Sequence, residues 1–190
     1  LSNTTAANNT ALGYASLFSN TTGANNIALG YAASYTNVTG FNNTAIGVNA
    51  LYTNTASNNT AIGRDALKLS TADNCVAVGS LALDANSTGA ANVAVGYAAL
   101  GANTTGDYNV AIGGGALDTN TTGSNNVAMG INALTANTTA TNNTALGYQA
   151  LSANTTGAGN VALGAQALEN ATTADYNTAI GLQALDTCTT

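Results

Sequence analysis

The sequence contains no histidine, no proline and no tryptophan, and only 5% of its 190 residues are charged, against about 25% in an ordinary soluble domain. Without histidine, the Ser-His-Asp and Cys-His arrangements of nucleophilic catalysis cannot be built. The two basic residues, Arg64 and Lys68, stand against eight acidic residues, so the formal net charge is −6. A nucleic acid or an anionic membrane surface is therefore an unsuitable partner, because both need Lys and Arg.

Other absences exclude further classes of function. No apolar run approaches the roughly 20 residues that a membrane-spanning helix needs, so we expect no membrane insertion. The acidic residues do not recur as close pairs that could do acid–base chemistry or hold calcium, and the glycines do not cluster into a phosphate-binding loop. We therefore predict no catalytic residue, no metal site and no cofactor, and a protein that is not an enzyme.

The sequence is dominated instead by one short repeat. A glycine closes an Ala-[Leu/Ile/Val/Met]-Gly triplet every 17 residues, with two steps of 16, at Gly13, Gly30, Gly47, Gly63, Gly79, Gly96, Gly113, Gly130, Gly147, Gly164 and Gly181. A polar, low-complexity chain could also be disordered. A fixed short period argues against disorder and is typical of a solenoid, in which each unit packs on its neighbours.

Positions counted from this glycine, taken as 0, give the fold class. Position −3 is always Thr, Val or Ile and position −1 is always Leu, Ile, Val or Met, and β-branched residues favour strands. Seventeen residues leave no room for a helix beside a second strand and turns. The sequence predicts an all-β protein, a parallel β-solenoid of about eleven coils of 16–17 residues, forming one domain over residues 1–190. At the strand spacing such a rod is about 50 Å long.

The apolar columns predict how each coil packs. Position +3 is Ala in ten coils and position +4 is Leu in ten, so we expect a second short strand there with its Leu inward. We also expect the position −1 side chains to point inward. The Ala at position −2 is constant and suits a tight corner or the close approach of another chain.

An asparagine column at position −4 predicts a ladder of side-chain amides. Stacked at the strand spacing, identical amides hydrogen-bond along the column and satisfy polar groups at a turn. We expect this structural role for Asn9, Asn26, Asn43, Asn59, Asn92, Asn109, Asn126, Asn143, Asn160 and Asn177.

The segment "NTTG" at positions +7 to +10 predicts an exposed turn in which Gly supplies a positive φ. Asn-x-Ser/Thr acceptor sequences also fall in its +7 column, although a chain rich in Asn and Thr generates them by chance. If the chain is secreted through a glycosylating pathway, this column offers a row of N-glycosylation sites: Asn3, Asn20, Asn37, Asn86, Asn103, Asn120, Asn137 and Asn154.

The two cysteines, Cys75 and Cys188, lie six to seven coils apart, roughly 30 Å at the strand spacing. A disulfide needs Cα atoms within about 7 Å. They cannot pair within one rod, which leaves free thiols or a bridge between chains.

The stretches "NNTALGYQAL", "NNVAMGINAL" and "GNVALGAQAL" resemble the head repeats of YadA-like trimeric autotransporter adhesins, and are similar to repeats of tail-fibre-like surface proteins. The resemblance covers the whole chain and matches Ala145, Leu146, Gly147 and Ala150. It implies a β-roll, association into trimers, an extracellular or cell-surface location, and binding to surface glycans or matrix. The 17-residue coil is longer than the usual adhesin coil.

We therefore expect a non-enzymatic structural or adhesive protein that forms a rigid fibre shaft or head with copies of itself. The alternative is an ice- or glycan-binding solenoid that presents a flat Thr array. Because neighbouring residues on a strand face opposite ways, only one of two columns could form it. The +8 column holds Thr21, Thr55, Thr104, Thr121, Thr138, Thr155, Thr172 and Thr189; the +9 column holds Thr22, Thr39, Thr88, Thr105, Thr122, Thr139, Thr156 and Thr173.

The two terminal repeats look like all the others, although solenoids normally carry polar caps. An uncapped coil exposes unpaired strand N–H and C=O groups, which template the addition of another strand. We expect either a longer rod or copies that stack end to end into filaments.

Overall fold

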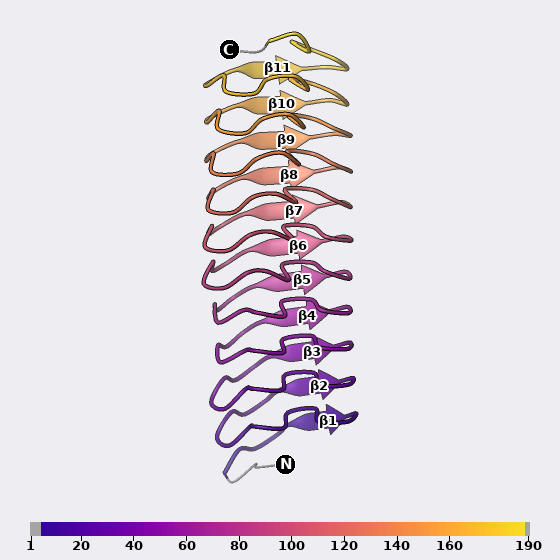
Figure 1. The fold of residues 1–190 in the computed structure, drawn as a ribbon, viewed down its shortest axis with the longest axis vertical. Coiled ribbons are helices and arrows are strands. Elements are labelled where there is room, and N and C mark those ends of the chain that lie inside the picture. Colours follow the sequence, from indigo (N-terminus) through magenta and orange to yellow (C-terminus); the bar gives the residue numbers. More distant parts are fainter. Residues whose placement is uncertain (1–4, 189–190) are drawn as a thin grey trace.

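The computed structural model describes residues 5–188 as a stack of coils with one short strand in each. Figure 1 shows the strands lying one above another along the rod, joined by loops on either side. The strands are β1 (Thr10–Leu12), β2 (Ile27–Leu29), β3 (Thr44–Ile46), β4 (Thr60–Ile62), β5 (Val76–Val78), β6 (Val93–Val95), β7 (Val110–Ile112), β8 (Val127–Met129), β9 (Thr144–Leu146), β10 (Val161–Leu163) and β11 (Thr178–Ile180). They form one 11-stranded sheet in sequence order, and every pairing is parallel. The predicted β-solenoid is confirmed.

The register keeps each repeat position in its own column. Ala28 pairs with Ala45 and Ala45 with Ala61, although the second step is one residue shorter. The shorter coils lose their residue in the turn before the strand, where Ala56 accepts the side-chain hydrogen bond that Gly40 accepts one coil earlier. The length change is therefore absorbed outside the sheet.

The core consists of small side chains from the strand and leucines from the following turn. The position −2 alanines from Ala28 to Ala179 are at most 3% exposed, and nine position +4 leucines are at most 2% exposed. Neighbouring strand residues face opposite ways, so positions −3 and −1 point outward, and none of their side chains is buried. The prediction that position −1 faces inward is wrong. The constant Ala at position −2 fills the interior instead of forming a corner.

The expected second strand at positions +3 and +4 is also absent from the described residues. Those positions lie in a turn whose residues at +2 and +4 have positive φ, as Ala15 (56°) and Leu17 (48°) do. Neighbouring coils still bond through this turn: the Leu17 N–H donates to Ala33 O over 3.0 Å, and the Ala32 N–H donates to Tyr14 O over 2.8 Å. The Leu at position +4 does point inward, as predicted.

The glycine at position 0 is required twice over. Gly30 has a φ of +136°, and a Cβ there would overlap the carbonyl oxygen of Gly47 in the next coil. The glycine of the "NTTG" segment has a different reason, because Gly40 is not among the positive-φ residues. A Cβ on Gly40 would overlap the carbonyl oxygen of Ala56, so close packing and not a positive φ favours glycine there.

Candidate functional site

The position −4 asparagines form a buried ladder, but they bond mainly to backbone groups, and bonds between two side-chain amides of the column occur at Asn126–Asn109 and Asn177–Asn160. Along it, each side-chain oxygen accepts from the next backbone amide, as in Asn26 N–H to Asn9 Oδ1 at 2.8 Å and Asn109 N–H to Asn92 Oδ1 at 2.8 Å. Each side-chain NH₂ donates to the carbonyl of a turn, as Asn26 Nδ2 does to Gly40 O at 2.8 Å. The residues named above from Asn26 to Asn160 are at most 1% exposed. The ladder satisfies buried polar backbone groups.

A second buried ladder occupies the +7 column, where an exposed turn was predicted. Asn120 Nδ2 donates to Asn103 Oδ1 at 2.8 Å and to Gly123 O at 3.0 Å. Asn20, Asn37, Asn86, Asn103, Asn120, Asn137 and Asn154 are at most 1% exposed, and Asn3 lies outside the described residues. The prediction of an exposed acceptor row is wrong, because the nitrogens that would carry glycans hold the interior together.

The third asparagine ladder, at position −5, was not predicted. Asn42 Nδ2 donates to Asn58 Oδ1 at 3.1 Å, and Asn8, Asn25 and Asn74 continue the row. These side chains are exposed and their backbones have positive φ, a conformation that Asn tolerates well. The signal was present in the sequence as the recurring Asn-Asn pair.

The two threonine columns differ sharply. Five of the +8 hydroxyls, those of Thr21, Thr104, Thr121, Thr138 and Thr155, donate to a carbonyl of the next coil, as Thr104 Oγ1 does to Thr121 O at 2.9 Å, so they belong to the stacking of the rod. All eight +9 threonines named above are exposed. Only the +9 column therefore presents an outward threonine row. Thr189 lies outside the described residues.

Burial raises the pKa values of one cysteine and two acids. Cys75 and Cys188 are both free within the chain, and burial raises the pKa of the Cys75 thiol. Partial burial also raises the pKa values of Asp84 and Asp118. Among residues 5–188, no group of three or more His, Cys, Asp or Glu side chains could hold a metal ion, and no helix is long and apolar enough to cross a membrane.

The outward strand face is a continuous uncharged strip, which we call the strand face; it consists of positions −3 and −1 of β1–β11. Every one of its residues is Thr, Val, Ile, Leu or Met. Exposed members include Ile62 (37%), Met129 (39%) and Leu163 (43%). Threonine fills position −3 in five strands, and the other side chains of the strip are apolar, so the strand face is a candidate interaction surface.

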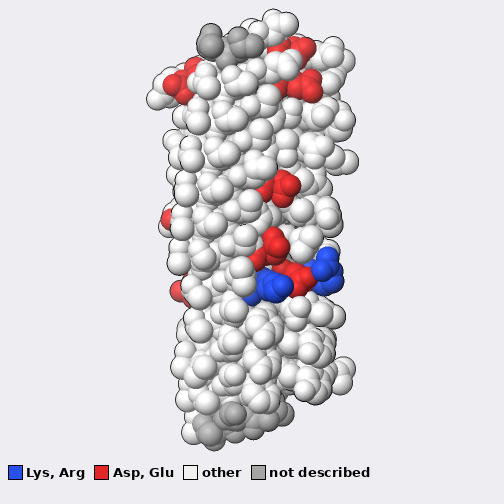
Figure 2. Space-filling view, in the orientation of Figure 1, with Lys and Arg blue, Asp and Glu red and all other residues white. Residues whose placement is uncertain are grey.

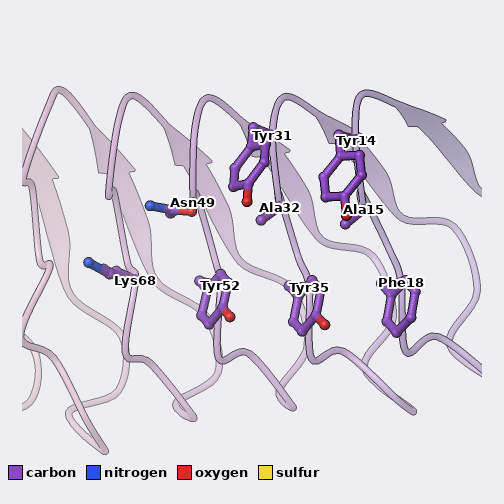
Figure 3. A pocket seen from close by; sticks show the side chains of 9 residues that line it. All are labelled: Tyr14, Ala15, Phe18, Tyr31, Ala32, Tyr35, Asn49, Tyr52 and Lys68. Atoms are coloured by element: carbon purple, nitrogen blue, oxygen red, sulfur yellow. The ribbon is translucent and has the colours of Figure 1, made fainter.

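A second surface feature is a trough near the indigo end of the rod, formed by two ladders of aromatic rings. Phe18, Tyr35 and Tyr52 stack with centroids 5.2 and 5.1 Å apart and planes within 4°, and Tyr14 stacks on Tyr31 at 5.4 Å. Figure 3 shows the two rows facing each other across the small side chains of the floor. The trough encloses about 570 Å³; it is lined by Tyr14, Ala15, Phe18, Tyr31, Ala32, Tyr35, Asn49, Tyr52 and Lys68.

Lys68 lies at one end of this trough, and Arg64, the other basic residue of the protein, is linked to it through Asp65. Arg64 Nη1 is 2.7 Å from Asp65 Oδ2, and Lys68 Nζ is 3.4 Å from Asp65 Oδ1. Burial alone would raise the pKa of Asp65, but a hydrogen bond from Asn49 and the charge of Lys68 hold it below its usual value. Figure 2 shows these blue side chains together on an otherwise mostly white surface.

Sequence reasoning did not find the trough, although the 17-residue period aligns its rings. Comparison with known proteins adds nothing here, since no family model, no curated protein and no solved structure matches the chain. The strand face and the trough therefore stand out by their geometry alone.

Proposed function

We propose that the protein is a non-enzymatic structural and adhesive module that forms an extracellular fibre shaft or head with copies of itself. The strand face is the observation that carries this proposal. Each strand turns its larger apolar side chains outward and sends only the alanine methyl group of position −2 into the interior, beside the leucines of the turn. Such a chain leaves apolar surface in water until another surface covers it.

A second copy of the chain is the partner that fits the strand face best. The strip carries no charge that would require a complementary partner. Its ridges repeat at the strand spacing of about 4.8 Å, so the ridges of one rod match the grooves of an identical rod along the full length. Sheets packed face to face in this way lie about 10 Å apart.

The size of the strip is suitable for such an association. Eleven three-residue strands cover a flat footprint of about 50 by 10 Å. The adjoining position +1 column adds exposed Tyr97, Ile131, Tyr148 and Leu182. Together these approach the roughly 800 Å² per partner of a stable protein interface.

Sedimentation equilibrium tests the proposal. We expect the wild-type chain to sediment as a multiple of its 18.5 kDa mass, and Val95→Lys, in the central strand β6, to sediment as a monomer with an unchanged circular dichroism spectrum. The matched control is Thr105→Lys, on the exposed +9 position of the same coil, which should sediment as wild type. A wild-type monomer at every concentration would overturn the proposal.

End-to-end stacking is a second contact that we include in the proposal. Among the described strands, β1 and β11 each pair on one side only, and an unpaired strand edge accepts another strand. Electron microscopy distinguishes the two contacts, because lateral association gives short bundles and axial stacking gives filaments. At the concentrations of the sedimentation experiment we expect only the lateral contact; filaments of Val95→Lys in concentrated samples would show axial stacking without the strand face.

The exposed +9 threonines favour one alternative, an ice- or glycan-binding surface. They form two runs, Thr22 and Thr39 before the 16-residue coils and six threonines from Thr88 to Thr173 after them. Thermal hysteresis measures ice binding directly. Activity in the wild type that Thr122→Lys abolishes would favour this alternative, and its absence would leave the strand face as the functional surface.

A further inference from the structure

The aromatic trough is suited to a ligand with both apolar and polar surface. Its walls are ring carbons, but four of its five aromatic side chains are tyrosines that carry hydroxyl groups. In Figure 3 the hydroxyls of Tyr14 and Tyr31 point toward the floor between the two rows. A purely apolar ligand would leave these hydroxyls without partners, which is unfavourable once water is expelled.

The rings are arranged like overlapping tiles. Parallel rings in contact are about 3.5–4.0 Å apart, whereas the centroids of Tyr35 and Tyr52 are 5.1 Å apart. The ring planes are therefore inclined, with their normals about 45° from the line of centroids. Neighbouring rings therefore do not cover each other fully, and Figure 3 shows part of the faces of the labelled rings in the view of the trough; aromatic faces attract the C–H groups of sugar rings.

The dimensions favour a short chain of similar units. The trough extends over four coils, from Tyr14 to Lys68, which gives about 15 Å at the strand spacing. One sugar unit of an extended oligosaccharide advances by nearly the length of one coil. Each of three sugar units therefore meets the aromatic rings of one coil in the same relative position. The trough's volume of about 570 Å³ lies within the usual range of about 300–1,000 Å³ for ligand sites.

Charge identifies the end of the ligand. Lys68 is the one charged side chain among the described residues that line the trough, and Arg64 lies beside it on Asp65. Asp65 pairs with both bases, which leaves one net positive charge among these three residues in a molecule whose net charge is −6, so within the trough an anion is favoured at this end. Asn49, whose NH₂ donates to Asp65 Oδ1 at 3.0 Å, keeps its side-chain oxygen for a sugar hydroxyl.

We propose that the aromatic trough binds an acidic oligosaccharide of about three units, with sugar rings against the tyrosines and a carboxylate at Lys68. This proposal rests on the adhesive function above and names its ligand class. A nucleic acid is disfavoured because two basic residues neutralise few phosphates. An acidic peptide would satisfy Lys68 but would leave the aromatic rows without a matching repeat, and it serves as a competitor in the test.

Calorimetric titration of the wild-type chain tests the proposal with two acidic trisaccharides, 3′-sialyllactose and trigalacturonate. Lactose and maltotriose are the neutral partners, and hexaglutamate is the peptide. We expect both acidic sugars to bind more tightly than their neutral partners at low salt. The acidic preference should weaken as salt rises, because exposed charges are screened. Equal affinity for acidic and neutral sugars, or tighter binding of hexaglutamate, would overturn the proposal.

Matched variants locate the site. Tyr31 and Tyr148 occupy the same repeat position with similar exposure, 55% and 51%, but only Tyr31 lines the trough. We expect Tyr31→Ala to weaken binding by up to about tenfold and Tyr148→Ala to leave it unchanged. Lys68→Gln should reduce acidic-sugar affinity about threefold to fivefold and leave neutral sugars unaffected. Equal losses in the two tyrosine variants would contradict the assignment.

Sedimentation of the same variants separates this inference from the proposed function. Tyr31→Ala should retain association, since it leaves positions −3 and −1 of the strand face intact and removes one side chain of the adjoining +1 column; Tyr148→Ala, in the same column, is its control. Val95→Lys should retain sugar binding as a monomer. Sugar binding lost in Val95→Lys but kept in Tyr31→Ala would place the ligand on the strand face and refute the trough.

Discussion

Ser34 is the one serine in the inward leucine column, and replacing it with leucine should stabilise the protein. Its side chain is fully buried between Leu17 and Leu51, and its Oγ has no hydrogen-bond partner. Ser34 has a φ of 52°, close to the 51° of Leu51. Leucine is therefore compatible with the backbone at this position.

The magnitude follows from two contributions. Burying a leucine side chain contributes about 1.5–3 kcal/mol, and removing an unsatisfied buried hydroxyl contributes about 1–3 kcal/mol. Allowing for imperfect fit, we expect Ser34→Leu to raise the free energy of unfolding by about 2–4 kcal/mol. For a chain of this size each kcal/mol shifts the midpoint of thermal unfolding by about 2–4 °C.

Urea unfolding followed by circular dichroism measures the effect. The control is the reverse change one coil away, Leu51→Ser, which should destabilise by a similar amount because it creates the same defect. An unchanged or lower stability in Ser34→Leu would refute the reasoning, since it would mean that the column has no room for a leucine at that coil.

Three further predictions concern the strand, the second ladder and a carboxylate. Ala145→Asp places a charge in a fully buried position and should lower the free energy of unfolding by at least about 3 kcal/mol. Leu146→Asp, at a residue that faces outward, should lower it by about 1 kcal/mol. Similar urea midpoints for the two variants would refute the inward direction of Ala145. Ala171→Asn should raise the free energy of unfolding in urea by about 1 kcal/mol, because the new side-chain NH₂ donates to Asn154 Oδ1, which has no partner. A loss of stability would refute this. The raised pKa of Asp118 means that the folded protein binds the proton of this carboxyl more tightly than the unfolded chain does. The contribution of Asp118 to stability therefore falls as pH rises from the unfolded pKa of about 3.9 through the folded pKa. Asp118→Asn should therefore be more stable than wild type at pH 7 and equal to it below about pH 3; a variant less stable at pH 7 would contradict the sign.

The sequence predicted the solenoid and its first ladder because both follow from fixed spacing. The glycine at position 0 marks every coil, and stacked asparagines such as Asn92 and Asn109 need only the strand spacing to hydrogen-bond. The inward leucine at position +4 was predicted for the same reason, since a large apolar residue in ten coils must have a constant environment.

The direction of the strand was not predictable in the same way. Alternation shows that Ala145 and Leu146 face opposite ways, but not which one faces inward. The larger residue was expected inside, as in most cores. Here Leu151 already occupies the interior from the turn, and only a methyl group fits opposite it.

The turn and the trough were beyond the sequence for other reasons. Leucine rarely adopts a positive φ, so nothing in the local sequence indicated that Leu17 and its column form a turn and not a strand. The trough depends on positions +1 and +5, which vary between coils. The period does align Phe18, Tyr35 and Tyr52, but a groove requires a second row and a low floor, which only the coil geometry provides.

The central claim is that the strand face of one rod packs against the strand face of another. Because β6 is the middle strand of eleven, it meets β6 of the second copy whether the rods run parallel or antiparallel. A nitroxide at Val95→Cys, with Cys188 replaced by serine, reports this contact by electron paramagnetic resonance. We expect an immobilised label and strong dipolar coupling, consistent with sheets about 10 Å apart, and a mobile, uncoupled label at Thr105→Cys. A mobile, uncoupled label at position 95 would contradict this claim.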